Sequence, residues 1–332
     1  MTAPASRVLE HIRTPALIVA RGQVAFANAA AQALLGSHII GQDVRIAIRS
    51  PDAVAAILGE SGGTARVDGL SVRGSVWDID CHVLGDGTRL VSLYDQSVQA
   101  GTARAHADFV ANASHELRTP LAAILGYVET LQNPKAGDDP ATRERFLGTI
   151  RHEARRMQAL VEDLMSLSRI EAVKHDAPSD PVDMVEIVHS AAGEFRDRAA
   201  VEVVANAASA PVLGDRGQLT QVLRNLIDNA VKYGRPGAPV HVALEATATG
   251  WLALSVRDEG EGIAPEHLPR LTERFYRADT GRSRAAGGTG LGLAIVKHIV
   301  ERHRGRFDIT SRPGVGTTAS LMLPMKQTVL EK

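Results

Sequence analysis

The chain has 332 residues, of which 44% are hydrophobic and 23% charged, proportions that are ordinary for globular proteins. At roughly 150 residues per domain, this length predicts two or three domains and excludes a fibrous protein or a single small module. Because 37 Lys and Arg balance 38 Asp and Glu, giving a net charge of −1, we expect no direct nucleic acid binding and no attraction to anionic membranes.

Cysteine usage and hydropathy predict a cytoplasmic protein. Cys81 has no second cysteine with which to form a disulfide, and one cysteine cannot make a zinc site, so we expect a small buried hydrophobic residue. No run approaches the ~18 consecutive apolar residues that a membrane helix needs, and residues 1–15 lack an apolar signal core. We therefore expect no transmembrane segment.

Residues 1–100 alternate short apolar runs with glycine-containing turns, a pattern typical of strands separated by brief helices. Between Trp77 and Val83, apolar and polar residues alternate strictly, which predicts a strand with one buried face. The order of elements resembles a PAS sensor domain. The predicted strands are 16–20, 24–27, 77–83 and 90–94, and a short helix is predicted over 28–35.

From about Gly101 the apolar spacing changes to three or four residues, which is typical of an amphipathic helix. Residues 133–140 break this helix, and a second helix follows with the same spacing. The two helices predict an antiparallel hairpin, which buries its apolar stripes by pairing with a second copy as a homodimeric four-helix bundle. The stripe residues are Val110, Ala113, Leu117, Leu121, Ile124, Val128 and Leu131, then Leu147, Ile150, Ala154, Met157, Val161 and Leu164.

Residues 176–181 are typical of a linker, and a third domain follows them. Its mixture of helices and strands predicts an α+β sandwich. The predicted helices are 183–200, 218–233 and 291–304, and the predicted strands are 201–204, 240–246, 252–257, 307–311 and 317–323.

The motif His-Glu-Leu-Arg-Thr-Pro begins at His115, early on the first hairpin helix. Because His115 precedes the stripe residue Leu117 by two positions, it is rotated about 200° from the stripe and points to solvent, where its imidazole can act as a nucleophile. Thr119 lies one turn further on the same face, and Pro120 loosens the helix locally. For an isolated histidine, a merely solvated side chain would be the better interpretation.

This motif, preceded by Asp-Phe-Val-Ala-Asn-Ala-Ser, closely resembles the phosphoacceptor motif of sensor histidine kinases of two-component systems. The resemblance extends from about Ala105 to Pro324 and is greatest to the phosphate-regulon type. It implies that His115 attacks the γ-phosphoryl group of ATP, and that Glu116 hydrogen-bonds the other ring nitrogen. Thr119 would orient a water for dephosphorylation of a partner.

The resemblance implies an ATP-binding domain with four further motifs, and all four follow in order. Asn-Leu-Ile-Asp-Asn-Ala-Val-Lys-Tyr looks like the N box of the family. Asn225 and Asn229 lie four apart on one helical face and can present amide oxygens to one Mg²⁺, while Lys232 adds a charge for the phosphates. Alone, Asn-x-x-x-Asn is more often a polar surface face.

The stretch ending in Asp-Glu-Gly-Glu-Gly-Ile resembles the first glycine box, in which Asp258 would accept a hydrogen bond from the adenine amino group. Arg-Phe-Tyr-Arg resembles the F box, and Gly-Gly-Thr-Gly-Leu-Gly-Leu resembles the second glycine box, which suits phosphate. Residues 277–292 would form a lid. The residues implied to bind ATP are Asn225, Asn229, Lys232, Tyr233, Asp258, Gly260, Gly262, Ile263, Arg277, Gly288, Thr289, Gly290, Leu291, Gly292 and Leu293.

The glycine pattern fits neither a Rossmann fingerprint, which follows a strand directly, nor a Walker A loop, which needs Gly-Lys-Ser/Thr. The resemblance implies a Bergerat-type fold, shared with gyrase-type and Hsp90-type ATPases. Where this chain has Asn225, those ATPases carry a glutamate that acts as the base for the attacking water. Because asparagine is a poor base, transfer to a histidine is favoured over hydrolysis. A regulated scaffold or phosphatase with weak kinase activity, and an ATPase, remain alternatives.

The resemblance also implies a partner, a response regulator whose aspartate receives the phosphoryl group and which is a winged-helix transcription factor by family default. Together these inferences predict a multidomain α+β protein. Its parts are a PAS-like domain (1–100), a dimerisation and histidine phosphotransfer hairpin (101–176), a Bergerat-type ATP-binding sandwich (177–326) and a tail (327–332).

Overall fold

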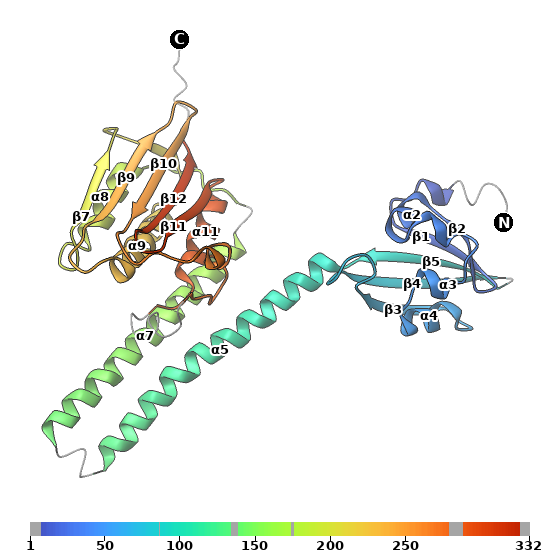
Figure 1. Cartoon of the computed structure of the whole chain (residues 1–332), viewed down its shortest axis with the longest axis horizontal. Helices are drawn as coiled ribbons and strands as arrows, with labels where there is room; N and C mark the ends of the chain where they lie inside the picture. The colour runs from blue at the N-terminus through green and yellow to red at the C-terminus, as the bar shows by residue number, and fades with distance from the viewer. Residues whose placement is uncertain (1–7, 86, 134–138, 174–175, 279–287, 326–332) are drawn as a thin grey trace. The chain divides into compact units, whose positions relative to one another are not determined.

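The computed structural model of the chain divides into two compact units, Met1–Ala111 and Asn112–Lys332. One helix, α5 (Ser97–Gln132), begins in the first unit and ends in the second (Figure 1). The three domains predicted from the sequence, with their boundaries, stay predictions. The structure describes residues 8–85, 87–133, 139–173, 176–278 and 288–325.

The N-terminal unit is built on a five-stranded antiparallel sheet with the strand order β2-β1-β5-β4-β3. The four predicted strands and the predicted helix are present, whereas β3 and the helices α3 and α4 were not predicted. The elements are β1 (Ala16–Ala20), β2 (Gln23–Ala27), α2 (Ala29–Leu35), a 3₁₀ turn (Ser37–Ile39), α3 (Val44–Ala47), α4 (Pro51–Leu58), β3 (Gly63–Asp68), β4 (Val76–Gly85) and β5 (Thr88–Asp95).

One apolar core holds this unit together, and it includes Leu17, Ile57, Ile79 and Leu93, all fully buried. Cys81 is buried in the same core, as predicted, and burial raises the pKa of its thiol.

The second unit begins with a helical hairpin formed by the later part of α5 and by α7 (Pro140–Ala172). Asp139 caps α7 by accepting a hydrogen bond from the Thr142 backbone N–H at 3.0 Å. The rings of Tyr127 and Phe146 pack across the hairpin with centroids 5.0 Å apart. Helix α5 continues through Pro120, which is buried, and most of the predicted break at 133–140 lies outside the described residues.

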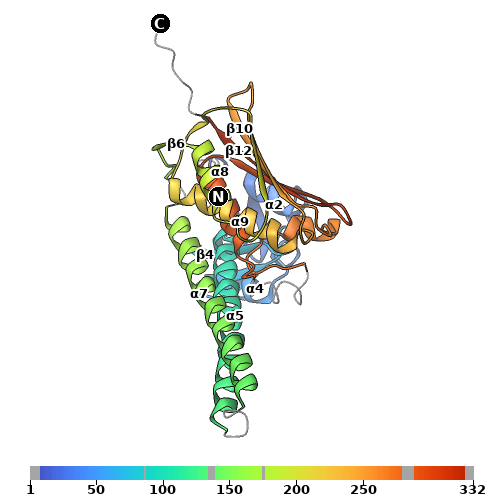
Figure 2. The same ribbon diagram turned by 90° about the vertical axis from the view of Figure 1, so that its left-hand side faces the viewer.

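The hairpin is followed by a five-stranded sheet of order β11-β12-β10-β9-β7, in which only the β7–β9 pair is parallel. Helices α8, α9 and α11 cover one face (Figures 1 and 2). The elements are β6 (Pro181–Asp183), α8 (Met184–Gly193), β7 (Val201–Ala205), β8 (Pro211–Leu213), α9 (Arg216–Tyr233), β9 (Val240–Ala246), β10 (Trp251–Arg257), a 3₁₀ helix (Pro265–Arg270), α11 (Gly292–Arg302), β11 (Arg306–Arg312) and β12 (Gly316–Pro324).

The strands of this sandwich alternate in burial because helices cover only one side of the sheet. On β10, Leu252, Leu254 and Val256 are buried, and the residues between them are half-buried. Two predictions were wrong in detail. The helix predicted over 183–200 ends at Gly193, and the linker predicted over 176–181 ends where β6 pairs with β8.

No helix in the described part of the chain has both the length and the apolar character that a membrane crossing requires.

Candidate functional site

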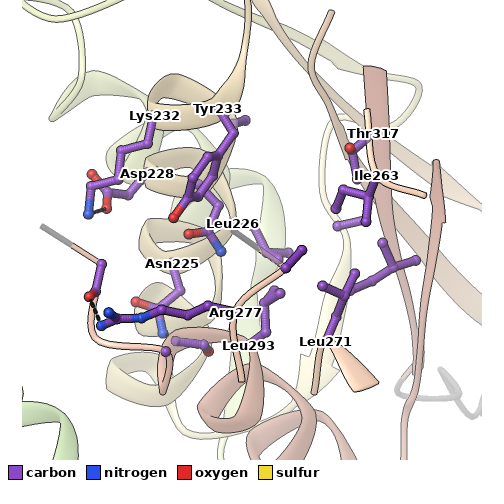
Figure 3. Close-up of a pocket in the computed structure, with 18 of the residues that line it drawn as sticks. Asn225, Leu226, Asp228, Lys232, Tyr233, Ile263, Leu271, Arg277, Leu293 and Thr317 are labelled. Atoms are coloured by element: carbon purple, nitrogen blue, oxygen red, sulfur yellow. Dashed lines mark hydrogen bonds and ion pairs between the residues drawn. The ribbon is translucent and has the colours of Figure 1, made fainter. Parts of the chain in front are cut away.

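A cavity of about 400 Å³ lies between α9, the end of β10 and the glycine-rich stretch before α11 (Figure 3). This volume is within the usual range for a small-molecule site. All residues predicted to bind ATP line it, except Gly260 and Leu291. The lining members of that set are Asn225, Asn229, Lys232, Tyr233, Asp258, Gly262, Ile263, Arg277, Gly288, Thr289, Gly290, Gly292 and Leu293.

Helix α9 presents one polar face to this cavity. Its opposite face is apolar and buried, which fixes the rotation of the helix. Asn225 and Asn229 therefore both line the cavity, as their spacing predicts. The Asn225 Nδ2 donates to the Gly292 carbonyl at 3.2 Å, so its amide oxygen stays available as an acceptor.

Asp228, on the same face of α9, was not predicted from the sequence. Its Oδ2 lies 2.6 Å from the Lys232 Nζ, and its Oδ1 accepts a hydrogen bond from Arg198 at 3.0 Å. Lys232 is thus held in an ion pair within the cavity wall. Its predicted role of adding a charge for the phosphates stays a prediction. The four-residue spacing of the aspartate and the lysine is the signal that predicts such a pair.

Asp258 follows β10 and is only 8% exposed. Its Oδ1 accepts hydrogen bonds from the backbone N–H groups of Gly260, at 2.8 Å, and Thr317, at 3.3 Å. Burial raises the pKa of this carboxyl group, and these two hydrogen bonds oppose the rise. A side chain at position 260 would overlap the Tyr233 carbonyl, so only glycine fits there. Gly260 packs against the residues that form the cavity wall and does not line the cavity itself.

The glycine-rich stretch before α11 contributes Gly288, Thr289 and Gly290 to the cavity wall. Leu291 is fully buried, and its N–H donates to the Thr289 hydroxyl at 3.3 Å. The middle of the predicted lid, residues 279–287, lies outside the described residues.

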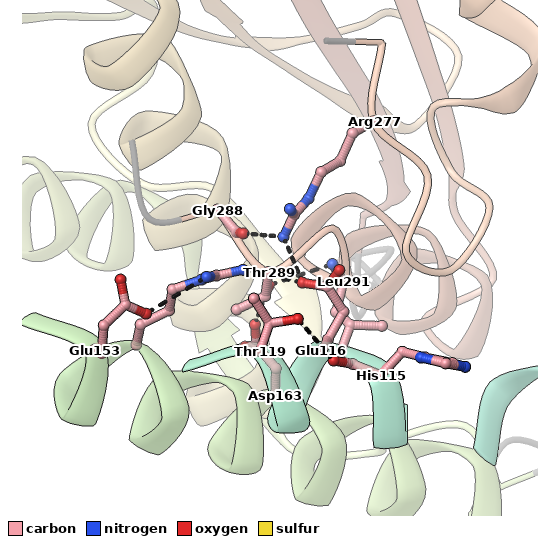
Figure 4. A network of polar contacts seen from close by, with 10 residues as sticks. His115, Glu116, Thr119, Glu153, Asp163, Arg277, Gly288, Thr289 and Leu291 are labelled. Carbon is pink, nitrogen blue, oxygen red and sulfur yellow. Dashed lines mark hydrogen bonds and ion pairs between the residues drawn. The ribbon is translucent and has the colours of Figure 1, made fainter. Parts of the chain in front are cut away.

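His115 is exposed on α5, as predicted (Figure 4). The Thr119 hydroxyl donates to the His115 carbonyl at 3.3 Å, so both residues lie on one face, one turn apart. The Glu116 Oε2 instead contacts two guanidinium groups, those of Arg156 at 3.0 Å and Arg277 at 3.3 Å. Glu116 was predicted to hydrogen-bond the His115 ring, but in the structure its carboxylate contacts Arg156 and Arg277.

Arg277 connects the cavity to α5, the helix that carries His115. Its side chain is only 6% exposed, lines the cavity, and contacts both the Gly288 carbonyl and Glu116 (Figure 4). A second link is the hydrogen bond from the Thr289 hydroxyl to the Asp163 Oδ2, at 2.6 Å.

The cavity fits a magnesium nucleotide better than a metal ion bound by protein alone. The described residues contain no cluster of three or more His, Cys, Asp or Glu side chains suited to a metal. Two asparagine amides beside a glycine-rich stretch would suit a cation whose coordination is completed by phosphates.

Comparisons with known proteins agree with this geometry. The family model described as His Kinase A (phospho-acceptor) domain matches residues 105–173. The model described as Histidine kinase-, DNA gyrase B-, and HSP90-like ATPase matches residues 214–327. Together the two matches cover more than half of the chain.

Curated relatives carry the same assignment. Sensor-like histidine kinase SenX3 of Mycolicibacterium smegmatis is 38% identical over 263 residues, which cover 77% of this chain and 66% of that protein. Phosphate regulon sensor protein PhoR of Pseudomonas aeruginosa is 43% identical over 215 residues, which cover 64% of this chain and 48% of that protein. The chain thus spans between about half and two thirds of these relatives.

A solved structure shares the fold along most of the chain. It is histidine kinase ThkA in complex with response regulator protein TrrA, which is 17% identical, with a TM-score of 0.54 over 96% of this chain and 98% of that one. The predicted resemblance to phosphate-regulon sensor kinases is confirmed, and the chain belongs to the sensor histidine kinase family.

Proposed function

We propose that the protein is an ATP-dependent histidine kinase that phosphorylates itself on His115. The observation that carries this proposal is the position of Arg277, whose buried guanidinium lines the nucleotide cavity and also contacts Glu116, the residue next to His115. The exposed imidazole and the cavity thus belong to one connected arrangement. Asn225, where hydrolytic relatives of the fold carry a base, favours transfer over hydrolysis.

In this mechanism the residues of the chain mainly position the reactants. Asp258 accepts a hydrogen bond from the adenine amino group, and Asn225 and Asn229 would hold a magnesium ion. When bound, Mg²⁺ neutralises charge on the phosphates. A ring nitrogen of His115 then forms a bond to the γ-phosphorus as the bond to the β–γ bridging oxygen breaks, which leaves ADP.

We further propose that the phosphoryl group passes from His115 to an aspartate of a response regulator, with a winged-helix transcription factor as the family default. The solved complex of a related kinase with a response regulator supports a partner of this class. Thr119, exposed beside His115, supports phosphatase activity because its hydroxyl can orient a water.

The hairpin is proposed to form a homodimeric four-helix bundle. Large apolar side chains on both helices are exposed in the single chain, among them Leu121 (46%), Val128 (38%), Leu147 (47%) and Val161 (47%). An exposed apolar stripe of this length is what a second copy would cover.

The N-terminal unit is proposed to be a PAS-like sensor domain. The order of two strands, short helices and three strands supports this proposal, as does the single sheet that they form. The domain boundaries at 100 and 176 and the cytoplasmic location stay predictions.

The experiment that tests the proposed function is incubation of the purified protein with γ-labelled ATP and Mg²⁺. A histidine kinase accumulates label on the protein, and the label is stable in base and labile in acid. An ATPase would release labelled phosphate without labelling the protein, and a scaffold would do neither. Either of the last two results would contradict the proposal.

A further inference from the structure

The nucleotide cavity has a wall that the ATP-binding sandwich does not supply. Ala159 and Asp163, four residues apart on α7, line it together with residues of α9 and the glycine-rich stretch. Figure 4 shows Asp163 rising from the hairpin towards Thr289. The hairpin and the sandwich therefore both line the cavity, and the hairpin contributes an acidic residue, Asp163.

The contact between the hairpin and the sandwich extends along one face of α7. Leu160, Leu167 and Ile170 are at most 4% exposed, and α7 packs against α11. Polar contacts flank this face, since Ser166 bonds the Gln221 side chain at 2.9 Å. Residues 160, 163, 166, 167 and 170 follow the spacing of a single helical face, so Asp163 lies within the docked surface.

Asp163 is an unusual residue for such a surface. Burial raises the pKa of its carboxyl group, while the Thr289 hydrogen bond and the nearby Lys232 oppose the rise. Glu162 and Asp228 act in the same direction as burial. A neutral residue would lose less solvation at this position, so docking is costly whenever the Asp163 carboxyl group is ionised.

The negative charge of Asp163 matters because Thr289, its hydrogen-bond partner, lies where the phosphates of ATP would bind. Under the proposed function, on which this inference rests, the glycine-rich stretch around Thr289 receives the phosphates of ATP. Carboxylate and phosphate oxygens are both acceptors and both anionic. They compete for the Thr289 hydroxyl, and each charge disfavours the other across a partly desolvated cavity.

We propose that Asp163 is an anionic residue of the nucleotide site that makes docking of the hairpin and binding of ATP compete. When α7 is docked, Asp163 holds Thr289 and repels the phosphates. When ATP is bound, the same repulsion weakens docking by an equal factor, because the coupling between two binding events is reciprocal. The nucleotide thereby releases the sandwich to move along the hairpin.

The test is the affinity of the full chain for the non-hydrolysable nucleotide AMPPNP with Mg²⁺, measured by calorimetry. Asp163→Asn keeps the size of the side chain and an oxygen that can accept from Thr289, but removes the charge. We expect at least threefold tighter binding. Glu162→Gln is the matched control, because it removes the same charge from the neighbouring exposed residue, and we expect its affinity to stay within twofold of the wild type.

The outcomes separate this inference from the proposed function. Unchanged or weaker binding by Asp163→Asn, while the wild type binds, overturns the role of Asp163 and leaves nucleotide binding intact. Equal tightening by Glu162→Gln also overturns it, since a general charge effect would then suffice. Absence of binding by every form of the protein overturns both proposals. Circular dichroism checks that each variant is folded.

Discussion

The hairpin and the ATP-binding sandwich bury their apolar side chains in different ways. In the sandwich, Leu223, Leu254 and Ile295 are at most 1% exposed, so the sheet and its helices form a closed core. In the hairpin, Leu121 and Leu147 are nearly half exposed. The sandwich is therefore complete as a single copy, whereas the hairpin needs another surface.

The candidate functional residues of the sandwich and of the hairpin differ in burial in the same way. Asp258 is buried behind a strand and depends on backbone geometry from several elements, while His115 is exposed on one helix. A site of the first kind is sensitive to the whole fold around it. The exposed His115 site depends only on α5 and on the molecule that binds beside it.

Replacement of Asn229 tests the sandwich alone. Asn229→Ala removes an amide oxygen from the cavity, so we expect Mg-ATP binding to become undetectable by calorimetry, with at least a hundredfold loss, while the dimer persists. Asn206→Ala, at an exposed position directly after β7, is the control and should bind normally. Unchanged ATP affinity in Asn229→Ala would count against the site.

A charge on the hairpin stripe tests its need for a partner. Leu121→Lys should weaken the homodimer at least tenfold in sedimentation experiments, because a lysine buried between two copies loses its solvation. Val204→Lys, at a position 60% exposed on the sandwich, should leave the dimer unchanged. A Leu121→Lys protein with wild-type dimer affinity, or a monomeric wild type, contradicts the proposed bundle.

Thr119 tests whether two reactions at the hairpin are separable. Thr119→Ala should slow dephosphorylation of a cognate regulator about tenfold, a loss of ~1.4 kcal/mol in transition-state stabilisation, because the water loses its orienting hydroxyl. Labelling of His115 should survive. If both activities fall together, the Thr119 hydrogen bond to the His115 carbonyl is structural, and the separation of roles is wrong.

His303 gives the smallest effect, on the stability of the sandwich. Its Nε2 accepts from the Asp215 N–H at 3.0 Å and its Nδ1 lies 2.8 Å from the Ile299 carbonyl, so the ring is neutral, and burial lowers its pKa. Below about pH 6.5 the unfolded chain therefore binds more protons than the folded chain, and the free energy of unfolding falls as pH falls.

The measurement is urea unfolding between pH 5 and pH 8. His303→Gln should reduce the pH dependence, whereas His189→Gln, at an exposed position, should not. An identical pH dependence in His303→Gln and the wild type would show that this histidine does not contribute.

The sequence predicted the parts of the site that depend on local periodicity. His115 and Thr119 share a face of α5, and Asn225 and Asn229 share a face of α9, because each pair lies four residues apart. The period of the helix and a specific motif were sufficient in both cases.

Contacts between distant segments were not predicted. Thr289 meets Asp163 across 126 residues of sequence, and Arg277 meets Glu116 across 161. No local pattern carries that information, because it depends on how α7 packs against α11. The strands β6 and β8 were missed for a different reason, since three residues are too few to show a period.

The location of the phosphoryl group decides whether His115 is the residue that ATP phosphorylates. His115→Gln should abolish the acid-labile, base-stable label obtained from γ-labelled ATP, while Mg-ATP binding stays at the wild-type level. His152→Gln is the matched control, since His152 is also exposed on the hairpin and is also followed by a glutamate, and it should label normally. Label retained at the wild-type level in His115→Gln would show that His115 is not the phosphorylated residue.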